Sequence, residues 1–181
     1  MRPRPAGTTA VAADLRYDES MSLTPKRAAE SVTEMVQVVL PNDANPLGYI
    51  LGGTVMHLID IAGAIASLRH TRTAVVTAAV DGLQFLHPIK VGDLIILNAR
   101  VTCVFTTSLE VQVDVFSEET LTGKRKQTSR AFLTFVAVSP EGAPVPVPPL
   151  VIESEEEKRV AHEARVRREE RLKQKLVTKL S

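Results

Sequence analysis

The pattern of hydrophobic residues changes along this chain, and the change separates one apolar helix from a set of strands. Between Gly53 and His70, apolar side chains occupy nearly every side of a helical projection, interrupted by one acid, Asp60. A helix that is apolar all round is expected to be buried. Residues 108–118 instead alternate, with Leu109, Val111, Val113 and Val115 on one face and Glu110, Gln112 and Asp114 on the other. This period of two predicts a strand with one buried and one wetter face.

The same reading predicts further strands on both sides of the helix. They are expected at residues 34–40, 75–86, 94–105 and 126–138, with a bend near Gly82 in the second. The last one is apolar on both faces in its second half, so it should lie inside the sheet or beneath a partner. An α+β fold follows, with an antiparallel sheet of about five strands against one helix. Such a sheet covers one side of the helix, and a second copy of the chain is the simplest cover for the rest.

The ends of the chain differ from this middle region, which we assign to residues 31–150. Residues 1–30 are polar and irregular and are predicted to form a flexible tail. Residues 140–149 contain five prolines and should form an extended strap. Residues 151–181 carry a charged helical pattern, in which Glu155–Arg159, Glu163–Arg167 and Glu169–Lys173 are expected i,i+4 pairs. We expect a solvated surface helix there; the alternatives are a helix on a neighbouring subunit or one that brings cations near a ligand phosphate.

Composition narrows the functional classes. The chain has 181 residues and a formal net charge of +1, which gives no general electrostatic reason to bind nucleic acid. Its one cysteine, Cys103, excludes an intrachain disulfide, and with the four histidines it makes no metal-ligand spacing. No run reaches the ~18 apolar residues of a membrane span. A cytoplasmic protein is therefore the expectation.

The candidate chemistry lies where a polar turn runs into the apolar helix. Asp60 is a carboxylate among hydrophobic neighbours, which is costly unless the group is hydrogen-bonded or paired. Gly53 opens the helix, where free backbone N–H groups and the helix dipole favour negative charge. Asp60 follows seven residues later, close to two turns, so both residues lie on roughly one face.

The ordered set of residues around this turn resembles the hotdog-fold acyl-CoA thioesterases, in particular the bacterial YciA-type and animal brain-type acyl-CoA hydrolases. The resemblance rests on Asn45-Pro46-Leu47-Gly48, Leu51-Gly52-Gly53, Met56, Asp60 and Ala62-Gly63-Ala64-Ile65. Downstream it continues through Val75-Val76-Thr77, Val80-Asp81, Phe85, Pro88-Ile89, Val91-Gly92-Asp93, Thr107-Ser108 and Phe135-Val136-Ala137-Val138. It covers residues 35–150.

The resemblance implies a hotdog fold, in which the sheet wraps around the central helix. Two chains would form a double hotdog, and three such dimers would assemble into a hexamer. The implied reaction is hydrolysis of an acyl-CoA thioester to a free acid and coenzyme A, with coenzyme A as part of the substrate and no separate cofactor or metal. The catalytic roles fall on Asn45 and Asp60, which would meet across the dimer interface, Asp60 acting as general base or as nucleophile.

Other residues are assigned supporting roles at this site. Gly53 and Thr77 are expected near the thioester, with the Thr77 hydroxyl as a partner for the water or for Asp60. The pantetheine arm is expected near Val80, Asp81 and Gly82. Ser108 and Arg125 are expected near the coenzyme A phosphates, with Arg69, Arg72, Lys90 and Lys124 as further candidate cations. Met56, Ile59, Ile65 and Phe85 are expected to limit the length of the acyl chain.

Two alternatives remain open from the sequence. The first is a non-catalytic protein that binds or senses acyl-CoA. The second is a hotdog dehydratase or hydratase, which needs a histidine in a different arrangement. His57, one turn before Asp60, is interpreted as a pocket wall or a core residue, and Cys103 as a small buried hydrophobe.

Overall fold

The structure, a computed structural model, describes the backbone of residues 23–180 and the side chains of residues 23–174. In chain order its elements are β1 (Lys26–Arg27), the 3-10 helix η1 (Ala28–Ser31), β2 (Thr33–Val38), the 3-10 helix η2 (Pro41–Asp43), α1 (Gly52–Thr71), β3 (Ala74–Phe85), β4 (Leu94–Val104), β5 (Ser108–Glu118), β6 (Arg125–Val138), β7 (Leu150–Val151) and α2 (Glu155–Leu180). The apolar helix and all the predicted strands are therefore confirmed, with their ends displaced by two residues at most.

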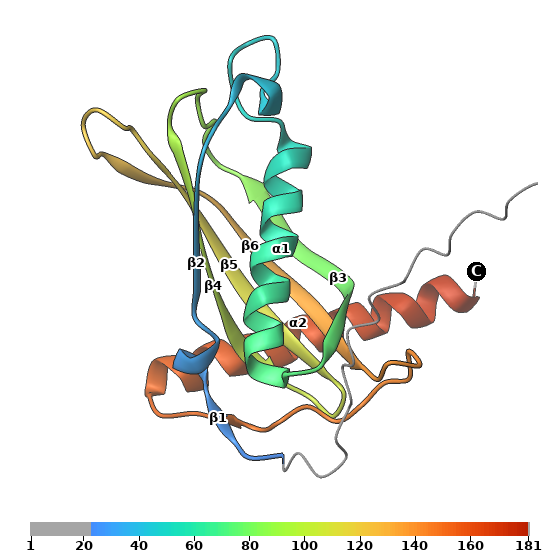
Figure 1. The fold of residues 1–181 in the computed structure, drawn as a ribbon. Helices are drawn as coiled ribbons and strands as arrows, with labels where there is room; N and C mark the ends of the chain where they lie inside the picture. Colours follow the sequence, from blue (N-terminus) through green and yellow to red (C-terminus); the bar gives the residue numbers. More distant parts are fainter. Residues whose placement is uncertain (1–22, 181) are drawn as a thin grey trace, which may run out of the picture.

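Five strands form one antiparallel sheet in the order β2-β4-β5-β6-β3 (Figure 1). The prediction that β6 lies inside the sheet is confirmed, and β3 is an edge strand. The bend expected near Gly82 is present: the pairing of β3 with β6 shifts between Asp81 and Gln84, and Gly82 has a φ of 65°. A positive φ is easily adopted by glycine, so this residue allows the edge strand to bulge.

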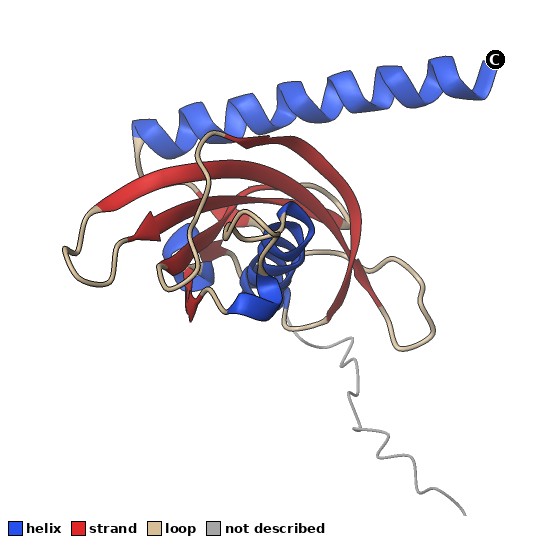
Figure 2. Cartoon of the chain, turned by 90° about the horizontal axis from the view of Figure 1, so that it is seen from above, coloured by secondary structure: helices blue, strands red, loops and turns tan. Residues whose placement is uncertain are grey.

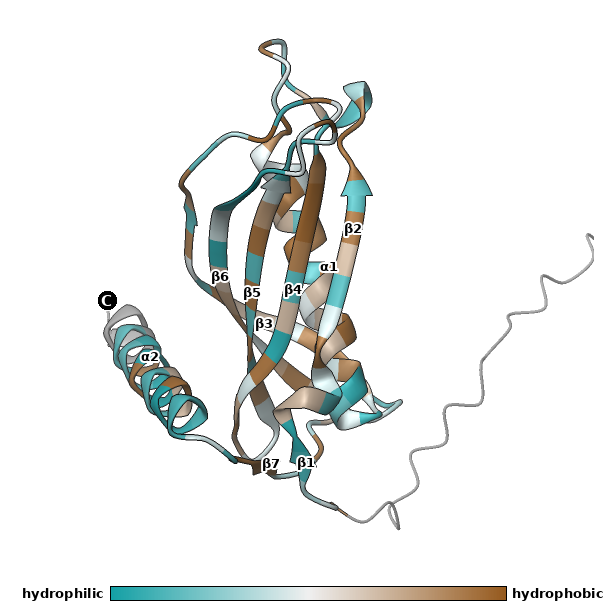
Figure 3. Ribbon diagram, turned by 90° about the vertical axis from the view of Figure 1, so that its left-hand side faces the viewer, coloured by the Kyte–Doolittle hydropathy of each residue, from teal (hydrophilic) through white to brown (hydrophobic). Residues whose placement is uncertain are grey.

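Helix α1 lies in the concave side of the sheet, so the molecule has the hotdog arrangement (Figure 2). Its inward side packs on hydrophobic side chains of β4, β5 and β6. The apolar first residues of β4 are drawn in brown in Figure 3. The closest approach is at Gly63, where an added Cβ would lie 2.9 Å from the buried Phe135 ring. Its other side keeps Met56 and Leu68 nearly half exposed, at 48% and 42%. One chain therefore covers its central helix incompletely.

Helix α2 corrects the expectation of a solvated C-terminal helix. It crosses the convex face of the sheet, opposite α1 (Figures 1 and 2), and buries Val160, Ala161 and Ala164. Because of this cover, the polar face of β5 is buried as well, with Glu110 only 1% exposed. The expected i,i+4 pair of Arg167 with Glu163 is replaced by an ion pair between Arg167 and Glu110.

Part of the segment predicted to be a flexible tail, residues 1–30, forms regular structure. Within residues 1–30, the first 22 lie outside the described residues, but β1 pairs with β7 in a small parallel sheet and Ala28 in η1 is buried. The proline-rich strap is extended, as predicted, and returns the chain along the end of the sheet. Its Val145 N–H donates to the Ala137 carbonyl. Among residues 23–180, no helix combines the length and the hydrophobicity needed to cross a membrane.

Candidate functional site

Asn45 is held by the turn that leads into α1. Its side-chain Oδ1 accepts hydrogen bonds from the backbone N–H groups of Leu47 and Tyr49, at 2.9 and 3.2 Å. Two N–H donors at one end of the amide identify that end as the oxygen. The Nδ2 group is thereby turned away from the turn and has no acceptor among the residues that the structure describes. Asn45 thus presents a fixed hydrogen-bond donor.

The first turn of α1 offers backbone donors close to this amide. The N–H of Val55 makes the first bond of the helix, to the Leu51 carbonyl, so the N–H groups of Gly52 and Gly53 precede the helical ladder. A Cβ on Gly53 would meet no described atom within 4 Å, and its φ is not positive. Nothing in the packing of the chain itself therefore requires glycine at position 53.

Asp60 is bonded to Thr77, as the sequence suggested was possible. The Thr77 hydroxyl donates to Asp60 Oδ1 at 2.6 Å, which ties the middle of α1 to edge strand β3. Asp60 is half-buried and Thr77 is exposed. Asp60 lies eight residues after Gly52, about 12 Å further along the helix axis. Within one chain, Asn45 therefore lies near the start of α1 and Asp60 near its middle.

A cavity of about 370 Å³ begins beside Asn45 and the start of α1. Its lining includes Asn45, Ile50, Gly52, Phe85, Ile89 and Ser129. Of the four residues expected to limit acyl length, only Phe85 is part of this wall; Ile59 is instead in the core. Ser129 was missed. Its buried hydroxyl has no hydrogen-bond partner within the described part of the chain. It lies in the polar first half of β6, between Thr128 and Arg130, where no sequence signal distinguishes it.

The structure separates the residues expected to contact coenzyme A. Val80 is exposed on β3, and Gly82 forms the bulge. The carboxylate of Asp81 is engaged by Arg171 of α2, a contact that the sequence did not indicate.

The two expected phosphate contacts lie at opposite ends of β5. Ser108 is its first residue, and Arg125 pairs with Glu118, its last. The strand length places them about 30 Å apart, so a single chain does not bring both to one phosphate.

Among the described residues, neither His57, His70 nor Cys103 is placed to act as a catalytic base or nucleophile. His57 is exposed, whereas His70 is fully buried with Nε2 2.9 Å from the Pro148 carbonyl. Burial lowers the pKa of His70, which disfavours the charged ring, and its Nδ1 has no described partner. The side chain packs against the strap. Burial likewise raises the pKa of the Cys103 thiol, which disfavours the thiolate.

Comparison with known proteins gives consistent matches. Residues 47–124 match the model of the thioesterase superfamily. An acyl-CoA thioester hydrolase of Bacillus subtilis, YkhA, is 43% identical over 128 residues, covering 71% of this chain and 74% of that protein. The cytosolic acyl coenzyme A thioester hydrolase of rat is 34% identical over 79% of this chain, which spans only 38% of the rat protein.

Solved structures agree with these matches. An acyl-CoA hydrolase from Bacillus cereus superposes with a TM-score of 0.81 at 36% identity, covering 86% of this chain and 95% of that one. The acyl-CoA hydrolase of Staphylococcus aureus, in complex with butyryl coenzyme A and coenzyme A, gives 0.79 at 35% identity, covering 86% and 94%. Alanine variants of the latter replace an Asn, an Asp and a Thr separated by 15 and then 17 positions, the separations of Asn45, Asp60 and Thr77 here.

Proposed function

The chain belongs to the thioesterase superfamily, among the acyl-CoA thioester hydrolases, and from this premise we propose that it hydrolyses fatty acyl-CoA to a free fatty acid and coenzyme A by means of Asp60 and Asn45. The observation that carries the catalytic assignment is the 2.6 Å bond from Thr77 to Asp60 at the open edge of the sheet. The bond fixes one carboxylate oxygen and leaves the other for the reaction.

The chemistry requires a base or nucleophile and a donor for the developing oxyanion. Asp60, oriented by Thr77, takes a proton from water or attacks the thioester carbon itself. The Nδ2 group of Asn45 and the backbone N–H of Gly53 donate to the carbonyl oxygen. One such donor typically lowers the barrier by ~3–4 kcal/mol. The missing side chain at Gly53 leaves the room that the thioester needs to approach these donors.

Asp60 and Asn45 act together when they come from two chains. β3 is an edge strand whose Val76 and Val80 are 51% and 47% exposed, and Met56 and Leu68 of α1 are also exposed. An antiparallel pairing of two copies along β3 extends the sheet and reverses the partner's α1. The start of one α1, with Asn45, then approaches the middle of the other, with Asp60.

The proposed assembly is a trimer of such dimers, a hexamer; a related acyl-CoA thioesterase and a thioesterase of Yersinia pestis are hexameric. The acyl chain occupies the 370 Å³ cavity beside Asn45, where Phe85 forms part of the wall. Because Ser108 and Arg125 lie at opposite ends of β5, contacts from both to the coenzyme A phosphates come from different subunits.

The test is a thiol-release assay across acyl-CoA substrates of increasing chain length. Asp60→Asn removes the base while keeping the size of the side chain, and we expect turnover to fall by about 10²–10⁴-fold with an unchanged melting temperature. Asp43→Asn is the matched control, because the 3-10 turn uses only the backbone of Asp43, and it should retain activity.

Normal turnover by Asp60→Asn would remove Asp60 from the mechanism. If the wild-type protein binds acyl-CoA in calorimetry but releases no thiol, the protein is the non-catalytic binding module instead.

A further inference from the structure

A second cavity, of about 440 Å³, lies away from the candidate active site. It is bounded by the end of β4 at Cys103, the following turn at Phe105, the proline-rich strap at Val147 and β7 at Leu150, with Ala161 of α2 above. The cavity beside Asn45 is at the other end of the sheet, where β3 ends and β6 begins. The walls of the second cavity are mainly hydrophobic, and nothing in the proposed reaction uses them.

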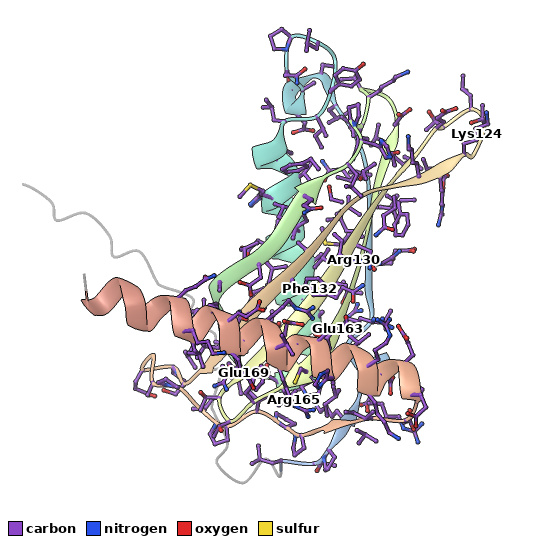
Figure 4. The ribbon with its side chains drawn as sticks, turned by 180° about the vertical axis from the view of Figure 1, so that it is seen from behind. Lys124, Arg130, Phe132, Glu163, Arg165 and Glu169 are labelled. Carbon is purple, nitrogen blue, oxygen red and sulfur yellow. The ribbon has the colours of Figure 1, made fainter. Side chains whose placement is uncertain are left out.

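Two arginines of α2, one that lines this cavity and one that stacks on a residue of its wall, differ from the other arginines of that helix. Arg159, Arg167 and Arg171 each form an ion pair with a carboxylate. Arg165 lines the cavity and has no ion pair or hydrogen bond among the described residues. Figure 4 labels Arg165 on α2, close to the proline-rich strap.

Arg168 is the second such cation. Its guanidinium stacks 4.3 Å from the centre of the Phe105 ring, which is part of the cavity wall, and it too has no acid partner in the described part of the chain. Arginine is the side chain best suited to bind a carboxylate through two parallel hydrogen bonds. A hydrophobic cavity thus has unpaired guanidinium groups at its border.

We propose that this cavity binds an aliphatic carboxylate of medium chain length, with its tail between Cys103, Val147 and Leu150 and its headgroup on Arg165 and Arg168. Small-molecule pockets measure about 300–1,000 Å³, and this one is near the lower limit, too small for a whole acyl-CoA. The hydrophobic walls disfavour a purely polar anion, and the arginines disfavour a cation. The site is separate from the proposed catalytic pair, although the acid released by that reaction belongs to the same chemical class.

The binding test uses the full chain and decanoate below its micelle-forming concentration. Calorimetry should detect binding to the wild type, and we expect the dissociation constant to rise by about tenfold or more in Arg165→Gln, since hydrogen bonds to charged groups are stronger than neutral ones. Arg159→Gln, which removes an exposed arginine already paired with Glu156 and Glu163, should bind decanoate like the wild type. Decanol, which lacks the charge, should bind much more weakly.

Equal binding of decanol and decanoate, or an unchanged affinity in Arg165→Gln, would each overturn the proposal. Arg165→Gln should retain thiol release, so failure of this site is distinguishable from failure of the proposed hydrolysis.

Discussion

Two glycines of α1 have opposite physical reasons for lacking a side chain. Gly63 faces the core, where a Cβ would lie 2.9 Å from Phe135, a ring that is only 1% exposed. Gly53 faces open space, where a Cβ would contact nothing described within 4 Å. The first glycine therefore serves packing inside the chain. The second serves something that is not part of the chain's own core, which in the proposed mechanism is the thioester.

Alanine at these two positions should separate stability from activity. Gly63→Ala should lower the free energy of unfolding by about 1–3 kcal/mol, because the buried Phe135 ring has to move. Gly53→Ala should be neutral or stabilising by up to ~1 kcal/mol, since alanine favours a helix, yet it should lower turnover by roughly 10²-fold through misplacement of the thioester. Urea unfolding and thiol release measure the two effects. Wild-type turnover in Gly53→Ala would contradict the close approach of substrate at this residue.

The sequence alone identified Asn45 and Asp60 through a family pattern, but it did not show what each side chain does. The turn contains Asn42 and Asn45, and composition does not distinguish them. The structure does: the Asn45 oxygen accepts two backbone N–H groups, which directs its amide nitrogen outward. The hydroxyl of Thr77 was expected near Asp60, and its bond to Oδ1 depends on how α1 lies on β3, which no local pattern encodes.

At the scale of elements, local periodicity predicted the position of the strands and not their environment. The alternation in β5 gave its limits without error, but its polar face was expected to be wet and is covered by α2. Glu110 is buried there with its charge compensated: Arg167 donates to both carboxylate oxygens, at 2.8 and 3.0 Å, and Thr102 donates at 2.8 Å. Arg167 also stacks 3.7 Å above the Phe132 ring, labelled in Figure 4. The charge pattern of α2 does not show whether the acid that pairs with a given arginine lies one turn away or on another element.

The Arg167–Glu110 pair should be the main polar anchor of α2. Arg167→Met leaves a buried carboxylate without its cation and should cost about 3–5 kcal/mol of unfolding free energy. Arg159→Met, at an exposed pair on the same helix, should cost far less, because water screens that pair. Adding Glu110→Met to Arg167→Met should recover most of the loss, because no unpaired charge remains. Urea unfolding at one fixed protein concentration measures all four proteins, and equal losses at positions 159 and 167 would contradict the anchor.

At the scale of the whole molecule, one chain is an incomplete enzyme in the proposed mechanism. Its central helix is covered on one side, its edge strand is open at Val76 and Val80, and its two catalytic candidates lie at different levels of the same helix region. The sequence predicted the need for a second copy from the excess of apolar surface on α1. Which residues meet at the interface depends on the symmetry of the pair.

A mixing experiment tests whether the catalytic residues come from two chains. Asp60→Asn and Asn45→Ala should each be inactive alone. In a dimer containing one chain of each variant, one site combines both mutations and the other combines the intact Asn45 with the intact Asp60. Random mixing by co-refolding should therefore recover about one quarter of wild-type thiol release. If both residues act within one chain, every site in the mixture carries a mutation and activity stays at the level of the separate variants.

Mixing Asp60→Asn with Thr77→Val is the matched control. Asp60 and Thr77 are bonded within one chain, so a mixed dimer has no site in which both are intact, and this mixture should show no recovery beyond the average of its two components.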